Sequence, residues 1–225
     1  MTQIEDENME VEVTINVDKQ SYESFCNSMK SSLVDIYDQW NIFFDTTDKS
    51  LSKSKKRCRV RSIETMNHQF QYTICAKSAA SDAISGSIAR RREIELDIPE
   101  ERFNDIIHHP DRYYTLAPEP IQKELNEFSE KTFCFMVDFR SIRRIYQLEE
   151  FKVESDECFL PDGTIFYQLE VESHKPEKAK SALVNKLNEL NLNFTEATTG
   201  KYTTLVSIPA DKRFSSRLQQ LISNS

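Results

Sequence analysis

Acidic residues two positions apart recur along this chain and are its first sign of chemistry. The pairs are Glu10 with Glu12, Glu93 with Glu95, Glu154 with Asp156, and Glu170 with Glu172. Residues two apart share one face of a β-strand, so each pair would present two carboxylates on the same side. Carboxylate oxygens from separate strands are ligands that Mg²⁺ and Mn²⁺ prefer. A single pair is more often the wet face of an edge strand, and the recurrence is what favours a metal site.

Basic residues occupy strands of the same alternating kind. The candidates for an anion site are Arg59, Arg61, Lys77, Arg143 and Lys201. Guanidinium groups bind phosphate oxygens as planar forks and lysines add point charges, so this mixture suits a string of phosphates better than a carboxylate ligand. The alternative is surface solubilisation, which we assign to Lys53, Lys55 and Lys56 in a polar connector.

Other kinds of active site find little support. The four histidines form no Ser-His-Asp or Cys-His arrangement, and the three glycines are isolated, so no phosphate-binding glycine loop is present. The five cysteines are dispersed and contain no C-x-x-C pair. That spacing fits neither a disulfide framework nor a structural zinc site, and it favours a reducing compartment.

The bulk composition indicates one globular domain. The chain has 225 residues, of which 38% are hydrophobic and 29% are charged. We expect a disordered tail over residues 1–8 and a single domain over residues 9–225. A net charge of -8 disfavours a protein that coats nucleic acid or anionic membrane. No stretch has the length of a membrane span, so a cytoplasmic protein is expected.

The elements that position these residues read mainly as strands. Residues 9–17 alternate strictly, with Val11, Val13, Ile15 and Val17 on one face and Glu10, Glu12 and Thr14 on the other. Further strands are predicted over residues 40–45, 57–64, 70–77, 92–98, 132–140, 143–148, 151–158, 164–173 and 201–208. Several of these strands alternate apolar with charged residues, a pattern that a closed antiparallel barrel with a charged interior accommodates.

Helical periodicity appears between and after the strands. Helices are predicted over residues 21–37, 100–108, 120–129, 175–190 and 211–222, and a loop or irregular lid over residues 78–89. The apolar stripe of the first helix should plug or flank the sheet.

Short motifs in a fixed order resemble a known family, the triphosphate tunnel metalloenzymes of the CYTH superfamily. They are E-V-E-V-T at residues 10–14, F-F-D-T at 43–46, R-V-R at 59–61, A-K at 76–77, E-I-E at 93–95, F-R-S-I-R-R-I-Y at 139–146, E-S-D-E at 154–157, F-Y-Q-L-E-V-E at 166–172 and G-K-Y at 200–202. Each motif is short, but their joint order over residues 9–208 is specific. The chain looks most like the short plant-type tripolyphosphatases.

The resemblance implies an α+β fold: a closed eight-stranded antiparallel β-barrel, or tunnel, with flanking helices. It also implies a divalent cation and hydrolysis of a terminal phosphoanhydride. Carried over by position, the metal ligands would be Glu10, Glu12 and Glu172, with Asp156 and Glu170 nearby. The phosphates would be bound by Arg59, Arg61, Lys77, Arg143 and Lys201. Glu93 or Glu95 would orient the attacking water or support a cationic side chain.

One position departs from the family signature. Thr14 stands where the signature has lysine, and a neutral hydroxyl cannot replace an ammonium beside a phosphate. Reduced activity, or a non-catalytic polyphosphate-binding module, is therefore an alternative to full activity. Compensation by Arg144 or Lys152 is a further hypothesis.

The sequence thus predicts a hydrolase that depends on Mg²⁺ or Mn²⁺ and acts on a small triphosphate, with inorganic tripolyphosphate as the first candidate. An RNA 5′-triphosphatase or a thiamine-triphosphatase is the alternative, and an adenylate cyclase ranks lower. Nucleic acid would be a partner only as a triphosphate-ended RNA, and no membrane partner is expected.

Overall fold

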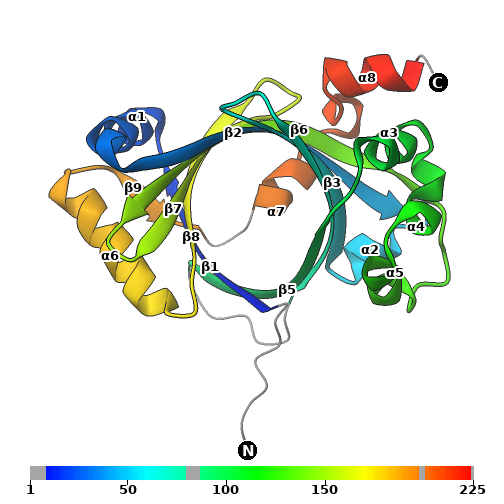
Figure 1. Cartoon of the computed structure of the whole chain (residues 1–225), viewed down its shortest axis with the longest axis horizontal. Helices are drawn as coiled ribbons and strands as arrows, with labels where there is room; N and C mark the ends of the chain where they lie inside the picture. Colours follow the sequence, from blue (N-terminus) through cyan, green and yellow to red (C-terminus); the bar gives the residue numbers. More distant parts are fainter. Residues whose placement is uncertain (1–8, 80–86, 198–200, 224–225) are drawn as a thin grey trace, which may run out of the picture.

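The computed structural model describes residues 9–79, 87–197 and 201–223, and it contains a closed antiparallel barrel (Figure 1). Its eight strands are β1 (Met9–Val17), β2 (Leu33–Thr46), β3 (Lys56–Thr65), β4 (Phe70–Ala79), β5 (Ile88–Asp97), β6 (Phe133–Leu148), β7 (Phe151–Phe159) and β8 (Ile165–Glu172). They follow the order β5-β4-β3-β2-β6-β7-β8-β1, and pairing of β1 with β5 closes the ring. The predicted fold class is confirmed. The predicted tail, residues 1–8, lies outside the described residues.

The apolar faces of the strands point outward, beneath helices. Val13 and Ile15 of β1 are fully buried under α1 (Lys19–Ser28) and α6 (Pro176–Glu189), which pack on one flank of the barrel. Figure 1 shows these two helices on the left, beside β7 to β9. The alternation of residues 9–17 therefore fixes the acidic face of β1 toward the barrel interior.

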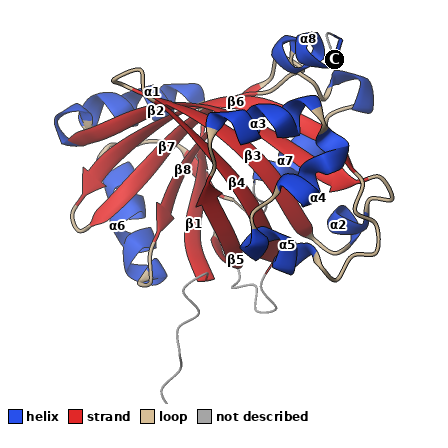
Figure 2. Cartoon of the chain, turned by 45° about the vertical axis from the view of Figure 1, so that its right-hand side comes forward, coloured by secondary structure: helices blue, strands red, loops and turns tan. Residues whose placement is uncertain are grey.

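A second apolar layer covers the opposite flank. Ile42 and Phe44 of β2 pack with α2 (Ser50–Lys53), α3 (Glu100–His108), α4 (Tyr113–Leu116) and α5 (Glu119–Leu125), and Tyr113 is fully buried there. The short 3₁₀ turn Pro110–Arg112 joins α3 to α4. Figure 2 shows these helices over β3 to β5. Helices on both flanks leave the barrel interior to the polar faces of the strands.

The predicted helix over residues 21–37 is wrong in its second half. α1 ends at Ser28, a 3₁₀ turn covers Lys30–Ser32, and β2 begins at Leu33. Leu33, Ile36 and Tyr37 continued the helical spacing by coincidence. They lie in a strand because β2 pairs with β6 along almost its entire length.

The strands predicted over residues 132–140 and 143–148 are one strand, β6. It runs from Phe133 to Leu148 without a break, because Ser141 and Ile142 pair with β2 on one side and β7 on the other. Residues 141–142, the gap between the two predicted strands, belong to β6, and Ser141 lines the barrel cavity.

The strand predicted over residues 201–208 is wrong, because the segment forms helix α7 (Lys201–Val206). Leu205 of α7 is fully buried against Val137 and Phe139 of the barrel. Figure 1 shows α7 across the barrel opening. Sequence analysis also missed β9 (Phe194–Glu196), which adds to the outer edge of β1.

The other predicted helices and strands are present in the structure, most of them with different first or last residues. Helices 120–129 and 211–222 correspond to the shorter α5 and to α8 (Ser216–Ser223), which follows a 3₁₀ turn at Ala210–Lys212. Of the loop or lid predicted over residues 78–89, the first two residues belong to β4 and the last two to β5, while residues 80–86 lie outside the described part. Within the described ranges, no helix is long and apolar enough to cross a membrane.

Candidate functional site

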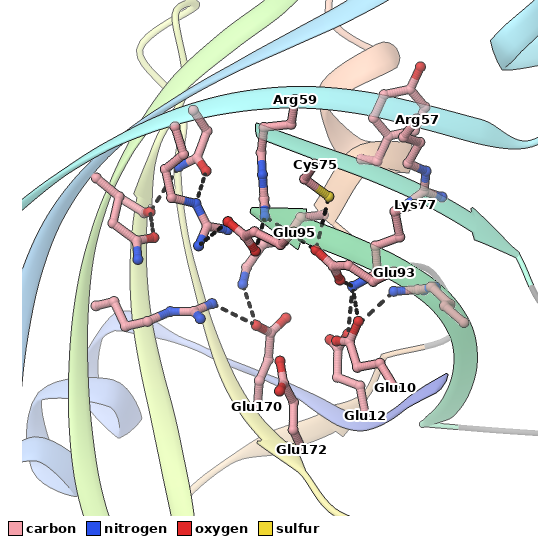
Figure 3. A pocket seen from close by; sticks show the side chains of 18 of the residues that line it. Glu10, Glu12, Arg57, Arg59, Cys75, Lys77, Glu93, Glu95, Glu170 and Glu172 are labelled. Atoms are coloured by element: carbon pink, nitrogen blue, oxygen red, sulfur yellow. Dashed lines mark hydrogen bonds and ion pairs between the residues drawn. The ribbon is translucent and has the colours of Figure 1, made fainter. Parts of the chain in front are cut away.

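The barrel encloses a cavity of about 520 Å³ whose wall is rich in charge (Figure 3). The described basic residues that line it are Arg57, Arg59, Arg61, Lys77, Arg91, Arg143 and Lys201. The acidic residues that line it are Glu10, Glu12, Glu93, Glu95, Glu170 and Glu172. Both sets come from the inward faces of strands, apart from Lys201 at the start of α7. The chemistry of such a wall suits a polyanion together with a cation.

Two arginines of β3 contact carboxylates of β5 across β4. Nη2 of Arg59 lies 3.1 Å from Glu95 and 3.4 Å from Glu93, and Nη1 of Arg61 lies 3.7 Å from Glu95. Nε of Arg61 also donates to Oδ1 of Asn41 at 2.9 Å. Burial opposes the charge of Arg59, but the carboxylates outweigh it and raise its pKa above the usual range. Burial and the neighbouring charge of Arg59 lower the pKa of Arg61, and Glu95 opposes that shift. Both guanidinium groups face the cavity.

Lys77 lies between two acidic side chains. Its Nζ is 2.5 Å from Glu10 and 2.5 Å from Glu93. Burial and a hydrogen bond with Glu93 raise the pKa of Glu10 to about 10. The pKa of Glu93 moves down despite burial, because Glu10 donates to it and Lys77 attracts it. Both carboxyl groups contact the same ammonium, and their pKa values move in opposite directions.

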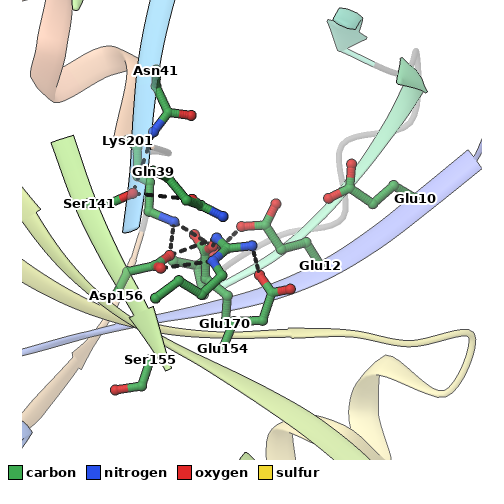
Figure 4. Close-up of polar contacts among 12 residues, drawn as sticks. Glu10, Glu12, Gln39, Asn41, Ser141, Glu154, Ser155, Asp156, Glu170 and Lys201 are labelled. Carbon is green, nitrogen blue, oxygen red and sulfur yellow. Dashed lines mark hydrogen bonds and ion pairs between the residues drawn. The ribbon is translucent and has the colours of Figure 1, made fainter. Parts of the chain in front are cut away.

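A second cluster joins β6, β7, β8 and α7 (Figure 4). Arg143 donates to both oxygens of Asp156 at 2.8 and 2.7 Å, and it lies 3.1 Å from Glu170 and in contact with Glu154. Lys201 contacts Asp156 and lies 2.5 Å from Glu170. Asp156 is fully buried, and although burial opposes ionisation, the two cations lower its pKa.

Carboxylates of β1 and β8 form the acidic wall. Glu12 pairs in register with Glu172, and Thr14 pairs with Glu170. The hydroxyl of Thr14 donates to Oε1 of Glu12 at 2.7 Å. Burial, with the nearby charges of Glu12 and Asp156, raises the pKa of Glu170 to about 8. Burial opposes ionisation of Glu12 too, but Lys77 and Arg91 lower its pKa to about 2.

This wall fits a divalent cation by its chemistry. The Glu12 and Glu170 carboxyls are hydrogen-bonded neighbours, and Glu172 opposite Glu12 is exposed. Across the described residues, no three acidic, histidine or cysteine side chains converge closely enough to form a complete metal cage. Mg²⁺ is commonly held by one or two carboxylates, with waters and phosphate oxygens as its other ligands, so an incomplete protein shell is compatible with it.

The structure brings the sequence-predicted residues together. All twelve candidates except Asp156 line the cavity, and Asp156 lies directly behind it in contact with Arg143 and Lys201. The predicted metal ligands differ in their neighbours. Glu10 contacts Lys77, Glu12 lies near Arg91 and Lys77, and Glu170 contacts Arg143 and Lys201, whereas Glu172 is exposed.

Sequence analysis missed two basic residues of the wall, Arg57 and Arg91. Arg57 is two residues before Arg59, and the same period of two that identified Arg59 and Arg61 placed it on the inner face. Arg91 alternates with Glu93 and Glu95 but lay outside the predicted strand 92–98. Its Nη1 is 3.3 Å from Glu12. The aromatic residues Phe43, Phe139 and Tyr202 also line the cavity and were not predicted.

The hypothesis that Arg144 or Lys152 compensates for Thr14 does not fit their positions. Arg144 donates to the hydroxyl of Tyr22 in α1, outside the barrel, and Lys152 is exposed. Thr14 itself is buried and is not among the described residues that line the cavity. The cation near Thr14 is Lys201 instead. Its ammonium contacts the carboxylate of Glu170, and Glu170 lies opposite Thr14 in the pairing of β1 with β8.

Comparisons with known proteins agree with this architecture. The family model of the CYTH domain matches residues 8–199. No curated protein sequence matches significantly. Among solved structures, HpAC1 from Hippeastrum, an adenylyl cyclase candidate with a dominant triphosphatase activity, aligns with a TM-score of 0.78 and 19% identity over 88% of this chain and 95% of its own.

Two further structures share the fold. An adenylate cyclase candidate from Bacillus halodurans aligns with a TM-score of 0.69 and 16% identity over 88% of this chain and 98% of its own. The PH1819 protein of Pyrococcus horikoshii aligns with a TM-score of 0.58 and 16% identity over 89% of this chain and 99% of its own.

Proposed function

The chain belongs to the CYTH domain family, and on that premise we propose that it is a divalent-metal-dependent hydrolase of a triphosphate, with inorganic tripolyphosphate as its first substrate. The observation that carries the proposal is the cavity wall, where seven basic side chains face a common space of about 520 Å³ beside an acidic wall. Guanidinium and ammonium groups gathered around one space suit the oxygens of a phosphate chain better than a neutral or cationic ligand.

The basic residues are proposed to bind the phosphate chain. Arg59, Arg61 and Lys77 approach from β3 and β4, and Arg143 and Lys201 approach from the other side. Each contacts carboxylates of the wall, so an entering phosphate exchanges one anionic partner for another. The cations are thereby held in place before the substrate arrives, which lowers the entropic cost of binding.

Glu12, Glu170 and Glu172 are proposed to hold Mg²⁺ or Mn²⁺, with Glu10 and Asp156 supporting the set. The metal, when bound, neutralises phosphate charge and polarises the phosphoanhydride. Phosphoryl transfer depends mainly on positioning and on neutralising spread negative charge, and the fixed guanidinium and ammonium groups of this wall supply both.

Glu93 and Glu95 contact Arg59, Arg61 and Lys77 directly. These contacts favour the supporting role over that of orienting water: the carboxylates hold the phosphate-binding side chains in place. Loss of Glu93 would then remove a partner of Lys77 and Arg59, and loss of Glu95 would remove a partner of Arg59 and Arg61.

The choice of substrate rests on the phosphate contacts of the cavity wall and on the comparison with a known structure. HpAC1, with its triphosphatase activity, supports a triphosphatase over a cyclase. An RNA 5′-triphosphatase or a thiamine-triphosphatase would use the same phosphate contacts and is the alternative. A non-catalytic polyphosphate-binding module is the alternative from another class, motivated by Thr14.

The test is phosphate release from tripolyphosphate, thiamine triphosphate, ATP and triphosphate-ended RNA, each with Mg²⁺, with Mn²⁺ and with a chelator. The proposal expects the fastest release from tripolyphosphate, and none with chelator. Preference for RNA or thiamine triphosphate would replace the substrate. Binding of tripolyphosphate without release from any substrate would support the non-catalytic module.

A further inference from the structure

Arg57 differs from the other basic residues of the cavity wall. Each of the other six lies within 4.0 Å of at least one carboxylate. Considering only the described residues, Arg57 has no carboxylate within that distance. Its guanidinium instead lies over the ring of Tyr202, 4.4 Å from the ring centroid. Figure 3 shows Arg57 apart from the carboxylates of Glu10 and Glu12.

The stacking partner is itself held in place. The Tyr202 hydroxyl lies 3.1 Å from the Ser52 hydroxyl and 3.5 Å from the sulfur of Met136. Its ring packs against Phe43 with centroids 5.4 Å apart. Stacking on a fixed aromatic ring sets the orientation of the planar guanidinium group. Its N–H groups then remain available to a ligand that lies in the plane of the guanidinium.

The surroundings of Arg57 favour an anion. Burial, and then the charge of Arg91, lower the pKa of Arg57 to about 10, although Tyr202, Glu12 and Glu93 favour its charged form. Among the described residues, none of these carboxylates forms an ion pair with it. Lys77 is its partner in register on β4. Arg57 is half-buried, and a partly desolvated cation gains from an anionic partner, which an entering phosphate would supply.

The position of Arg57 along β3 relates it to the other phosphate-binding residues. Arg57, Arg59 and Arg61 occupy successive inward positions of one strand. Two residues of an antiparallel strand span about 6.8 Å, so Arg57 leaves the strand about one such step beyond Arg59. A ligand bound at Arg59 and Arg61 reaches Arg57 only if it is long enough.

We propose that Arg57, fixed on Tyr202, is the subsite for the outermost phosphate of the chain and makes the cavity select three or more phosphates over two. The inference rests on the proposed function insofar as the ligand is a polyphosphate. It adds a specificity-determining residue to that function. The rival is a structural role, in which the stack only fastens α7 to the barrel.

The experiment is calorimetric titration of the full chain with tripolyphosphate and with pyrophosphate, with chelator present so that binding is measured without turnover. Arg57→Met removes the charge and keeps the apolar stem. The expected result is a loss of tripolyphosphate affinity of about 10- to 100-fold, the range for a hydrogen bond to a charged group, with pyrophosphate affinity changed less than about twofold.

Arg144→Met is the matched control, because Arg144 also lies over a tyrosine ring, Tyr22, but outside the barrel. It should leave both affinities unchanged, and Arg57→Lys should restore part of the tripolyphosphate affinity. A merely structural stack would lower both affinities alike or neither, and either result overturns the proposal. So does a wild-type protein that binds both anions equally.

Two further results keep this test separate from the proposed hydrolysis. If Arg57→Met fails to fold, as judged by circular dichroism, Tyr202→Leu replaces it: the charge remains but loses its platform, and the same selective loss of tripolyphosphate affinity is expected. If the wild type binds tripolyphosphate and cleaves nothing, the proposed hydrolase function is wrong. The tripolyphosphate and pyrophosphate affinities of Arg57→Met still decide the role of Arg57.

Discussion

At the scale of single residues, the cavity wall balances cations against carboxylates in small groups. Lys77 lies between Glu10 and Glu93, and Arg143 contacts Asp156 and Glu170. Removing one member of a buried pair leaves the other charge uncompensated, which is more costly than the pair is stabilising. Substitutions that test function should therefore target side chains whose removal does not strand a partner.

Glu172 is such a side chain, since it is exposed and forms no ion pair within the described part of the chain. Glu172→Gln keeps the volume and removes a proposed anionic metal ligand. We expect metal-dependent hydrolysis to fall about 100-fold, metal-free tripolyphosphate binding to persist, and excess metal to restore part of the rate. Glu157→Gln, on β7 and paired with Arg144 outside the barrel, is the control. Equal activity of the two variants would remove Glu172 from the metal site.

Thr14 tests the departure from the family signature. Thr14→Lys would place an ammonium beside Glu12, opposite Glu170. We expect tighter substrate binding by about tenfold, the effect of one charge-assisted contact, and a faster rate if the contact strengthens in the transition state. Separate measurement of kcat and KM distinguishes these effects. If neither parameter changes, Thr14 lies outside the reaction site; slower turnover would mean that Lys201 already fills this role.

At the scale of elements, strand periodicity located most of the site, and helix termini and strand continuity were harder to predict. Glu10, Glu12, Arg59 and Arg61 alternate with apolar residues, so their inward direction follows from the sequence. The apolar residues over Ser21–Tyr37 have a spacing that suits a helix. Pairing with β6 makes the second half of this range a strand, and the sequence does not show that pairing. Lys201 was placed in the correct cavity on the wrong element, because packing of Leu205 over the barrel end favours a helix.

The location of Lys201 on α7 has a consequence for stability. Lys201→Met leaves Asp156 and Glu170, both buried, with Arg143 as their remaining cation. We expect a loss of about 3–5 kcal/mol in the free energy of unfolding, typical of breaking a buried charge pair. Chemical denaturation measures it, with Lys186→Met in α6, whose partner Glu189 is exposed, as the control. Similar small losses in both variants would mean that α7 does not hold Lys201 against the barrel.

At the scale of the whole molecule, the strands of the barrel direct apolar side chains outward, under the helices, and charged side chains inward. In an ordinary globular core, the apolar side chains lie at the centre. The acidic net charge of -8 therefore says little about the ligand, because the cavity has its own local balance of charge. Composition alone could not reveal this, since it does not record which face of a strand a residue occupies. The alternation of each strand did.

This separation of core and cavity predicts that stability and activity can be changed independently. Leu183→Ala creates a cavity in the apolar layer between α6 and the barrel, where Leu183 is fully buried. We expect a loss of about 2–5 kcal/mol in the free energy of unfolding. The KM of the remaining folded protein should be unchanged. A large rise in KM would show that the outer layer shapes the site.

The most direct test of the central claim is ³¹P NMR of tripolyphosphate mixed with the full chain, first with chelator and then with excess Mg²⁺. The account predicts that the tripolyphosphate signals persist with chelator. After metal is added, pyrophosphate and orthophosphate should appear in equal amounts, since water cleaves one terminal phosphoanhydride per turnover. Tripolyphosphate signals that broaden on binding but do not decline after metal is added would contradict it.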